Sequence, residues 1–262
     1  MPGSTALVTG ATGGLGRAIA TALHERGARL IVTGRREAEL EALAQSLSAR
    51  AVVADLAVRG DVDRLASHAG DADIVVANAA LPATGQLAEF TRGEIDRMLE
   101  INLRAPIILT QALAPGMAAR GGGHFVLISS LSGKAASPAS SMYSATKFGL
   151  RGFGLALRQD LARQNIGVSV ISPGFIRDAG MFHESGVNRL PAGTGTRTPA
   201  DVAAAVIRAI EEDRAELDVA PPGLRVGAAV AALAPGLAAR AARRMGSHRL
   251  AGQMAAGQAD KR

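Results

Sequence analysis

Seven short runs rich in valine and isoleucine recur along this chain of 262 residues, and their alternation with helix-like stretches restricts the possible folds more than any other feature. We expect strands at residues 5–10, 29–34, 51–54, 73–78, 124–129, 168–172 and 216–220. Helical periodicity is found at residues 14–26, 36–48, 60–69, 91–119, 142–164 and 199–213. Strands that are apolar on both faces are typical of a parallel sheet covered by helices. The sequence therefore predicts an α/β fold, with a doubly wound, mostly parallel seven-stranded sheet in a single domain over residues 1–220.

Two segments fall outside this alternation. The first, residues 178–198, is glycine-rich and irregular, and it follows the sixth expected strand, where a doubly wound sheet presents ligand-facing loops. A connection of this length is usually a lid or a binding loop. Its large apolar residues are Met181, Phe182, Val187 and Leu190. They favour an apolar substrate. The second segment is the tail after the last strand.

Composition excludes several classes of protein. The chain has no cysteine, which excludes disulfides and thiolate metal sites, and its five histidines have no ligand-like spacing, so we expect no metal site. No run of about 18 apolar residues predicts a transmembrane helix. The strand pattern begins by about residue 5, which leaves no room for a cleavable signal. We therefore expect a cytoplasmic protein.

The net positive charge of the chain comes from the tail. The chain carries a net charge of +6, and residues 221–262 hold seven basic residues against one acid, so residues 1–220 are neutral overall. A nucleic-acid-binding body is therefore disfavoured. The tail divides into an apolar stretch, a break at Pro235–Gly236, and a basic stretch with Arg240, Arg243 and Arg244. It could cap the substrate pocket, reach a neighbouring subunit, contact an anionic membrane surface, or remain a solvated extension.

A glycine-rich turn, TGATGGLG, follows the first expected strand and opens the first helix. Its residues Gly10, Gly14 and Gly16 permit a tight turn, a close approach of the backbone to a pyrophosphate, and close packing of helix on sheet. The start of the helix offers free N–H groups and a partial positive charge to that phosphate. A bare strand-to-helix turn would also be rich in glycine, but its position after a first strand in a chain of βα units favours a dinucleotide site.

The end of the second expected strand indicates which dinucleotide binds. A fold that binds NAD usually ends this strand with an acid that holds the ribose 2′-hydroxyl. Here Arg35 and Arg36 follow Gly34, and Glu37 falls in the first turn of the next helix. Two arginines at a helix N-terminus are unfavourable unless an anion is near, and a guanidinium matches a phosphate geometrically. The alternative is a solvated arginine pair. We predict NADP(H) over NAD(H).

Tyr143 is the only tyrosine in the chain, and four residues later stands Lys147, one of three lysines among 26 arginines. Residues at positions i and i+4 share a helix face. The ordinary pKa of a tyrosine is about 10, too high for efficient proton transfer at neutral pH. An ammonium about 4 Å away would favour the phenolate by up to roughly 4 kcal/mol. That corresponds to a pKa lower by at most about three, so we expect a phenol that exchanges protons near pH 7. The alternative is a partly buried tyrosine beside an exposed lysine.

TGATGGLG, YSATK and the order of elements together resemble the short-chain dehydrogenase/reductase family, of the compact type that prefers NADP(H). The resemblance covers about residues 4–220 and implies a Rossmann fold. In that family the tyrosine and lysine of YxxxK are catalytic, and they match Tyr143 and Lys147. The substrate-orienting serine lies thirteen residues before the tyrosine and matches Ser130, and the helix asparagine that supports a proton-relay water matches Asn102.

The resemblance also implies the cofactor-binding residues. They are Gly10, Thr12, Gly13, Gly14, Leu15, Gly16, Arg35, Arg36, Asp55, Leu56, Asn78, Ala79, Ala80, Tyr143, Lys147, Pro173, Gly174, Ile176 and Asp178. In particular, Asp55 matches an acid that contacts adenine, and Pro173–Gly174 resembles the turn beside the nicotinamide.

Two motifs depart from the family. The segment ANAA, residues 77–80, resembles the family's NNAG but has Ala77 and Ala80 where the family has asparagine and glycine. Because Asn78 is kept, we expect a local rearrangement without loss of binding. Asp178 stands where the family usually has a threonine that bonds the carboxamide. A carboxylate can accept from that group but cannot donate, so we expect the nicotinamide loop to differ from the family geometry.

The resemblance implies hydride transfer between a nicotinamide and a carbonyl or secondary alcohol, with Ser130 orienting the oxygen and Tyr143 exchanging the proton. Because cellular NADP is mostly reduced, the reduction of an apolar ketone or aldehyde is the expected direction. A homo-oligomer, dimer or tetramer, is also expected. Two alternatives stay open: a non-catalytic NADP(H) sensor on the same fold, and a membrane or partner adaptor that acts through the basic tail.

Overall fold

A seven-stranded parallel sheet forms the centre of the computed structural model, which describes residues 1–187, 190, 194–244 and 247–258. Its strands are β1 (Thr5–Thr9), β2 (Arg29–Gly34), β3 (Arg50–Val53), β4 (Ile74–Ala77), β5 (Gly123–Ile128), β6 (Ile166–Pro173) and β7 (Glu216–Val219). They lie in the order β3-β2-β1-β4-β5-β6-β7, and every pair is parallel. The predicted doubly wound sheet is confirmed. Its order reverses between β1 and β4, the point at which such sheets bind ligands.

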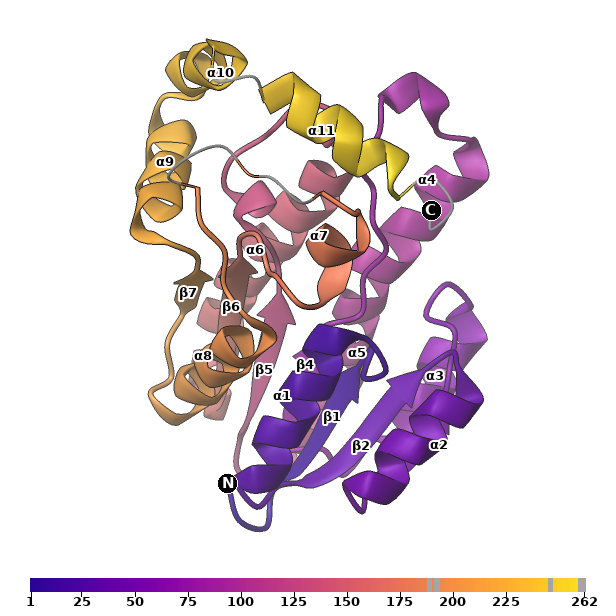
Figure 1. Ribbon diagram of the computed structural model, residues 1–262. Coiled ribbons are helices and arrows are strands. Elements are labelled where there is room, and N and C mark those ends of the chain that lie inside the picture. The colour runs from indigo at the N-terminus through magenta and orange to yellow at the C-terminus, as the bar shows by residue number, and fades with distance from the viewer. Residues whose placement is uncertain (188–189, 191–193, 245–246, 259–262) are drawn as a thin grey trace.

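Helices cover both faces of the sheet (Figure 1). On one face lie α1 (Gly14–Glu25), α2 (Glu37–Ser46) and α8 (Pro199–Glu211); on the other lie α3 (Arg59–His68), α4 (Arg92–Leu99), α5 (Ala105–Ala119) and α6 (Ser141–Leu161). Alternate residues of each strand point into opposite cores. Leu127 of β5 packs against the second helix layer, and its neighbours Val126 and Ile128 pack against the first.

The single helix expected at residues 91–119 is divided into three pieces. Between α4 and α5 lies one turn of π-helix, Glu100–Arg104, and the chain stays helical through it. Inside helices, such turns occur frequently at functional sites. Here the turn contains Asn102, which is almost fully buried.

The irregular segment at residues 178–198 contains the short helix α7 (Gly180–Glu184). A parallel bridge joins Ile176 to Arg197, so the two ends of the segment are fixed to each other. Two backbone bonds of 2.9 Å support the bridge, from the Arg177 amide to the Arg197 carbonyl and from the Arg197 amide to the Phe175 carbonyl. The predicted lid residue Leu190 is described, but residues 188–189 and 191–193 lie outside the described part of the chain.

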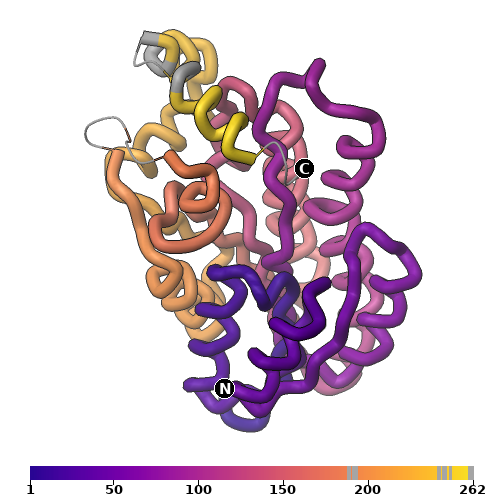
Figure 2. Tube along the Cα trace, turned by 45° about the vertical axis from the view of Figure 1, so that its right-hand side comes forward, coloured from indigo at the N-terminus to yellow at the C-terminus, as the bar shows by residue number. Residues whose placement is uncertain are grey.

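The tail forms three helices, α9 (Pro222–Leu233), α10 (Pro235–Arg244) and α11 (Ser247–Ala256). The predicted break at Pro235–Gly236 is the junction of α9 and α10, with Pro235 as the first residue of α10. Both views place these helices beyond the carboxyl ends of β6 and β7, with α10 at the edge of the molecule (Figures 1 and 2). Within the described ranges, no helix has both the length and the apolar character needed to span a bilayer.

Candidate active site

The turn after β1 is built so tightly that two of its positions require glycine. Gly10 has φ +63°, and a Cβ there would lie 2.9 Å from the Cα of Ala79. A Cβ on Gly16 would lie 2.2 Å from the carbonyl oxygen of Gly10. The turn is held from the opposite side by Asn78, whose Nδ2 donates to the carbonyls of Thr9 (3.0 Å) and Gly10 (3.3 Å). Asn78 of the ANAA segment therefore supports the turn, and retention of cofactor binding there stays a prediction.

The start of α1 faces a cleft of about 1000 Å³ at the carboxyl ends of β1 and β4. Gly13, the residue before the helix, caps none of the N–H groups of the first turn with a side chain. Predicted cofactor residues that line the cleft are Gly10, Thr12, Gly13, Gly14, Leu15, Gly16, Arg35, Arg36, Asp55, Leu56, Asn78, Ala79 and Ala80. An uncapped helix start beside glycines without room for a Cβ fits a pyrophosphate. Ala80 lies on the wall and is not among the described residues with positive φ, so the family's glycine is not needed there.

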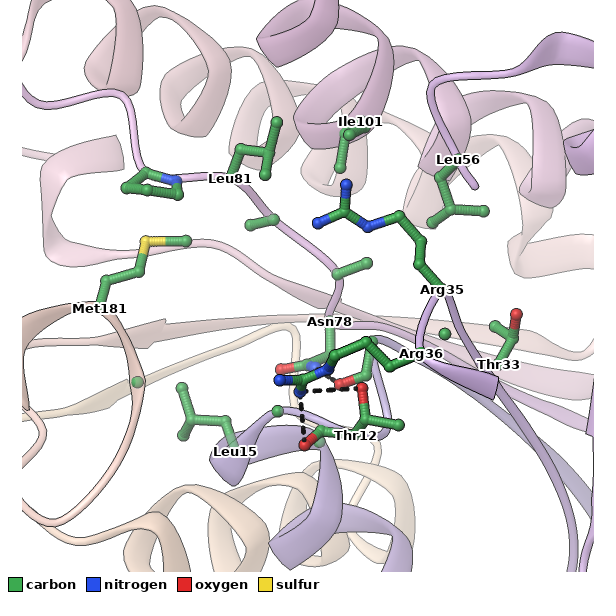
Figure 3. Close-up of a pocket in the computed structure, with 18 of the residues that line it drawn as sticks. Thr12, Leu15, Thr33, Arg35, Arg36, Leu56, Asn78, Leu81, Ile101 and Met181 are labelled. Atoms are coloured by element: carbon green, nitrogen blue, oxygen red, sulfur yellow. Dashed lines mark hydrogen bonds between the residues drawn. The ribbon is translucent and has the colours of Figure 1, made fainter. Parts of the chain in front are cut away.

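Three arginines line one end of the cleft: Arg35, Arg36 and Arg97. Arg36 lies over Thr12 and donates to its hydroxyl and its carbonyl at 3.3 Å, while Arg35 extends toward Ile101 (Figure 3). Arg36 also pairs with Glu39 at 3.1 Å on the exposed surface. Arg35 is 4.0 Å from Asp55. Guanidinium groups therefore line this end of the cleft, beside the carboxylate of Asp55.

The third arginine, Arg97 of α4, was not expected from the sequence. Its Nη2 donates to Oδ2 of Asp55 at 3.0 Å, while Oδ1 of Asp55 accepts from the Ala57 amide at 3.0 Å. The signal that could have found it is its spacing: Arg97 and Ile101 are four residues apart, share a helix face, and both line the cleft. The other lining residues that were not expected are Thr33, Gly34, Ala54, Leu81 and Pro82, while Gly180, Met181 and Glu184 belong to the predicted lid.

Ser130, Tyr143 and Lys147 converge where β5 ends and α6 begins. Ser130 is the second residue after β5, and its hydroxyl interacts with the Tyr143 phenol and donates to the carbonyl of Pro173 at 3.4 Å. The amine of Lys147 lies over the Tyr143 ring, 5.7 Å from its centroid, and donates to the carbonyl of Ile128 at 2.8 Å. The predicted pair therefore projects from one face of α6 toward the predicted serine.

Two unpredicted residues make this convergence possible. The hydroxyl of Ser129 donates to the Lys147 carbonyl at 2.9 Å, which fastens α6 to the end of β5. A Cβ on Gly133 would lie 2.7 Å from the same carbonyl. Glycine therefore allows residues 129–134, which we call the serine loop, to approach the helix. Both residues lie within four positions of Ser130, but nothing in their spacing distinguishes them from ordinary loop residues.

A partly buried group of ion pairs holds the other end of the serine loop. The amine of Lys134 lies 2.5 Å from Asp218 and 3.1 Å from Glu216, both on β7. Arg151 of α6 pairs with Glu216 at 2.6 Å. These side chains link the loop, α6 and β7, so the position of Ser130 is fixed by long-range contacts as well as by β5.

The expected lowering of the Tyr143 pKa is wrong for the protein in this structure. Burial raises the pKa of Tyr143 to about 12, and the Ser130 hydroxyl offsets only part of that change. Burial also lowers the pKa of Lys147 to about 8. The reason is burial, which disfavours the charged form of each group, the phenolate of Tyr143 and the ammonium of Lys147. The amine is still mostly protonated at neutral pH, and the phenol keeps its proton.

Asn102 has a structural task in addition to its place near the pair. Its amide forms two bonds with the backbone of Leu81, accepting from the amide at 2.7 Å and donating to the carbonyl at 3.0 Å. Its Nδ2 is also 3.4 Å from the hydroxyl of Thr146, the residue before Lys147. The π-helical turn thus connects the segment after β4 to the start of α6.

The remaining predicted residues lie outside the wall of the cleft. They are Tyr143, Lys147, Asn102, Ser130, Pro173, Gly174, Ile176 and Asp178. Pro173 ends β6 and Ile176 is buried. Asp178 has φ +70°, and its exposed carboxylate pairs with Arg177 at 3.4 Å. The structure thus brings the glycine turn and the arginines to one cleft. Asn102 links the cluster of Ser130, Tyr143 and Lys147 to that cleft, because it bonds Leu81 of the wall and Thr146 of α6.

The lid packs directly on the glycine turn. A Cβ on Gly14 would lie 2.2 Å from the Cβ of Ala179, and Gly180 contacts Leu15. Residues after α11 hold the lid from outside, because Nε2 of Gln258 donates to the Met181 carbonyl at 2.8 Å. The lid therefore separates the cleft from the C-terminal helices.

Comparisons with known proteins agree with this geometry. Residues 4–189 match the family model described as short chain dehydrogenase. Dehydrogenase/reductase SDR family member 7B from Bos taurus is 33% identical over 253 residues, which cover 88% of this chain and 78% of that relative. Ketoacyl reductase HetN from Nostoc sp. (strain PCC 7120) is 33% identical over 228 residues, with 84% and 79% covered. The structure of a short-chain dehydrogenase from Sphingobium yanoikuyae in complex with NADPH has a TM-score of 0.76 and 26% identity, and the match covers 82% of this chain and 87% of that one. This chain belongs to the short-chain dehydrogenase/reductase family.

Proposed function

We propose that the protein is an NADP(H)-dependent oxidoreductase that reduces the carbonyl group of an apolar ketone or aldehyde to an alcohol. The observation that supports this most is the meeting of Ser130, Tyr143 and the buried amine of Lys147 beside the cleft. Residues 1–220 would form the catalytic unit and residues 221–262 an extension of it. A homo-oligomer remains the expected assembly, to be measured by sedimentation velocity.

The residues that line the cleft fit a dinucleotide. The uncapped start of α1 would receive the pyrophosphate, and Asp55 with Leu56 would receive the adenosine end. Arg35 and Arg36 would hold the 2′-phosphate, because guanidinium groups bond phosphate oxygens in pairs. Once bound, the nicotinamide supplies a hydride to carbon, which is chemistry that protein side chains cannot provide.

The protein's own residues would control the proton. The Ser130 hydroxyl would hold the carbonyl oxygen, and Tyr143 would give its phenolic proton to that oxygen as the carbon is reduced. A phenol with a pKa of about 12 holds its proton at neutral pH, and an alkoxide is a much stronger base than a phenolate. The mostly protonated amine of Lys147 would stabilise the phenolate that forms. At neutral pH the phenol is therefore in the protonated form that reduction requires, and not in the phenolate form that oxidation requires.

The substrate class follows from the lid. Phe175, which follows the Pro173–Gly174 turn, and Phe182 of α7 form a tilted aromatic pair with ring centroids 5.0 Å apart. Met181 lines the cleft from the same helix. These apolar side chains favour an apolar carbonyl compound. The name of the Nostoc relative, a ketoacyl reductase, is consistent with carbonyl reduction.

The test is a panel of ketones and aldehydes of graded polarity, with NADPH oxidation followed by absorbance. We expect apolar members to be reduced, and we expect Tyr143→Phe to bind NADPH like the wild type while turnover falls by about a hundredfold to ten-thousandfold. Ser141→Ala, at an exposed serine on the same helix, is the matched control and should retain activity. Normal turnover by Tyr143→Phe would rule out the proposed role of the phenol.

A further inference from the structure

Large exposed apolar side chains are concentrated on α9 and α10. Among the described residues, nine large hydrophobic side chains are exposed, and four of them fall within twelve consecutive positions: Val226, Val230, Leu233 and Leu237. Leu233 is the most exposed of the nine, at 88%. Isolated exposed apolar residues are normal on soluble proteins, but a contiguous group marks a contact surface.

The spacing on α9 shows that these residues form one stripe. Val226, Val230 and Leu233 are separated by four and three positions, so they share a face of the helix. The opposite face packs inward through the buried Ala228. Leu237 on α10 is also exposed, at 63%, four positions after Leu233 in the sequence. The apolar stripe is therefore the face of α9 that stays exposed to solvent after the opposite face has packed on the protein.

The charge around the stripe is of one sign. Arg225, Arg240 and Arg243 are exposed, and the sequence has no acidic residue between Asp218 and Asp260. We call these three arginines and the four apolar residues the C-terminal face. An isologous contact between two copies would set arginines against arginines, which is unfavourable. A surface that combines aliphatic side chains with long cationic ones is complementary to anionic lipid headgroups above acyl chains.

We propose that the C-terminal face docks the protein on the surface of an anionic bilayer, without spanning it. Both views place α10 at an edge of the molecule, away from the strands β1 and β2 beside the cleft, so a flat surface can reach it (Figures 1 and 2). The aliphatic side chains enter the headgroup boundary, and the arginines bind lipid phosphates. This proposal does not depend on the reaction that the enzyme catalyses.

The experiment is co-sedimentation of the full-length protein with vesicles. We expect binding to vesicles of equal parts phosphatidylglycerol and phosphatidylcholine, and little binding to pure phosphatidylcholine. The double variant Leu233→Ser, Leu237→Ser should lower the partition coefficient at least about tenfold, since each exposed leucine contributes buried apolar area. Arg240→Gln with Arg243→Gln should lower it about tenfold or more and flatten its dependence on salt.

The matched control is Leu87→Ser, because Leu87 is 56% exposed but lies far from α9 in the sequence. That variant should bind vesicles like the wild type, and every variant should retain the wild-type far-UV spectrum and NADPH affinity. Wild-type protein that stays in solution with both kinds of vesicle would overturn the proposal. So would unchanged vesicle binding by the double leucine variant. A change in sedimentation mass for that variant, with no vesicle binding by the wild type, would identify the face as a contact between copies instead.

Discussion

Two of the arginines that line the cofactor cleft approach the same oxygen atom of Asp55. Oδ2 accepts from Arg97 at 3.0 Å, and Arg35 is 4.0 Å from it. Arg97 is therefore engaged in orienting the acid, while Arg35 is only loosely attached and can turn toward an incoming phosphate. The two arginines line the same cleft but should have different effects on cofactor choice.

At this scale we predict that Arg35→Ala weakens NADPH binding about tenfold to a hundredfold and NADH binding much less, since charge-assisted bonds to a phosphate are strong. Dissociation constants from cofactor fluorescence would measure both. Arg97→Ala is the comparison: it removes the partner of Asp55, so both cofactors should weaken by a similar factor. Equal losses of NADPH and NADH in Arg35→Ala would show that this residue does not read the 2′-phosphate.

At the scale of elements, the start of α1 depends on the absence of side chains. The carbonyl of Gly10 occupies the space that a Cβ of Gly16 would need, so the helix can approach the strand only with glycine at this position. The serine loop is positioned by ion pairs instead, which Lys134 forms with Asp218 and Glu216 of β7. The relative position of the two halves of the site therefore depends on how whole elements pack.

We predict that Gly16→Ala lowers the melting temperature and removes measurable NADPH binding, because α1 must move away from the turn after β1. Gly60→Ala is the matched control: Gly60 is also in the first turns of a helix, but a Cβ there meets nothing within 4 Å. That variant should match the wild type or gain about 0.5–1 kcal/mol from helix propensity. Thermal unfolding would measure the stability of both variants, and cofactor titration would measure their NADPH affinity. Intact NADPH binding by Gly16→Ala would contradict this account of the turn.

At the scale of the molecule, His124 joins neighbouring strands inside the core. It is buried at the start of β5, and its Nε2 is 2.7 Å from the hydroxyl of Ser169 on β6. Asp213 approaches Nδ1 at 4.0 Å, and Arg158 pairs with Asp213. Burial lowers the pKa of His124 from 6.5 to about 4, a change that Asp213 opposes and Arg158 reinforces.

This pKa predicts how stability depends on pH. The folded protein keeps His124 neutral, whereas the unfolded chain protonates it below its ordinary pKa, so the contribution is complete above pH 6.5 and is lost as the pH falls toward 4. At about 1.4 kcal/mol per pKa unit, it amounts to roughly 3 kcal/mol. Urea unfolding at a series of pH values between 6.5 and 5 would measure the slope while most carboxylates stay ionised. His124→Gln should flatten that slope, and an unchanged slope would contradict the assignment.

Much of the fold and the chemistry could be predicted because the responsible patterns are local. Runs such as IVV at residues 74–76 predict buried strands wherever they pack, and an i, i+4 pair such as Tyr143 and Lys147 shares a helix face by helix geometry alone. The pairing of Asp55 with Arg97, 42 positions away, has no local signal. The π-helical turn at Asn102 was missed for the same reason, since its bonds to Leu81 form only in the packed chain.

The sequence by itself determined the strands, the helices, the glycine turn and the shared helix face of Tyr143 and Lys147, because backbone geometry and apolar periodicity act over a few neighbouring residues. The tertiary structure decided the protonation of Tyr143, since burial raises its pKa, where the spacing to Lys147 alone predicted a lower one. It also decided which side of α9 faces outward, because a helix with apolar residues on several sides exposes whichever ones its packing leaves uncovered.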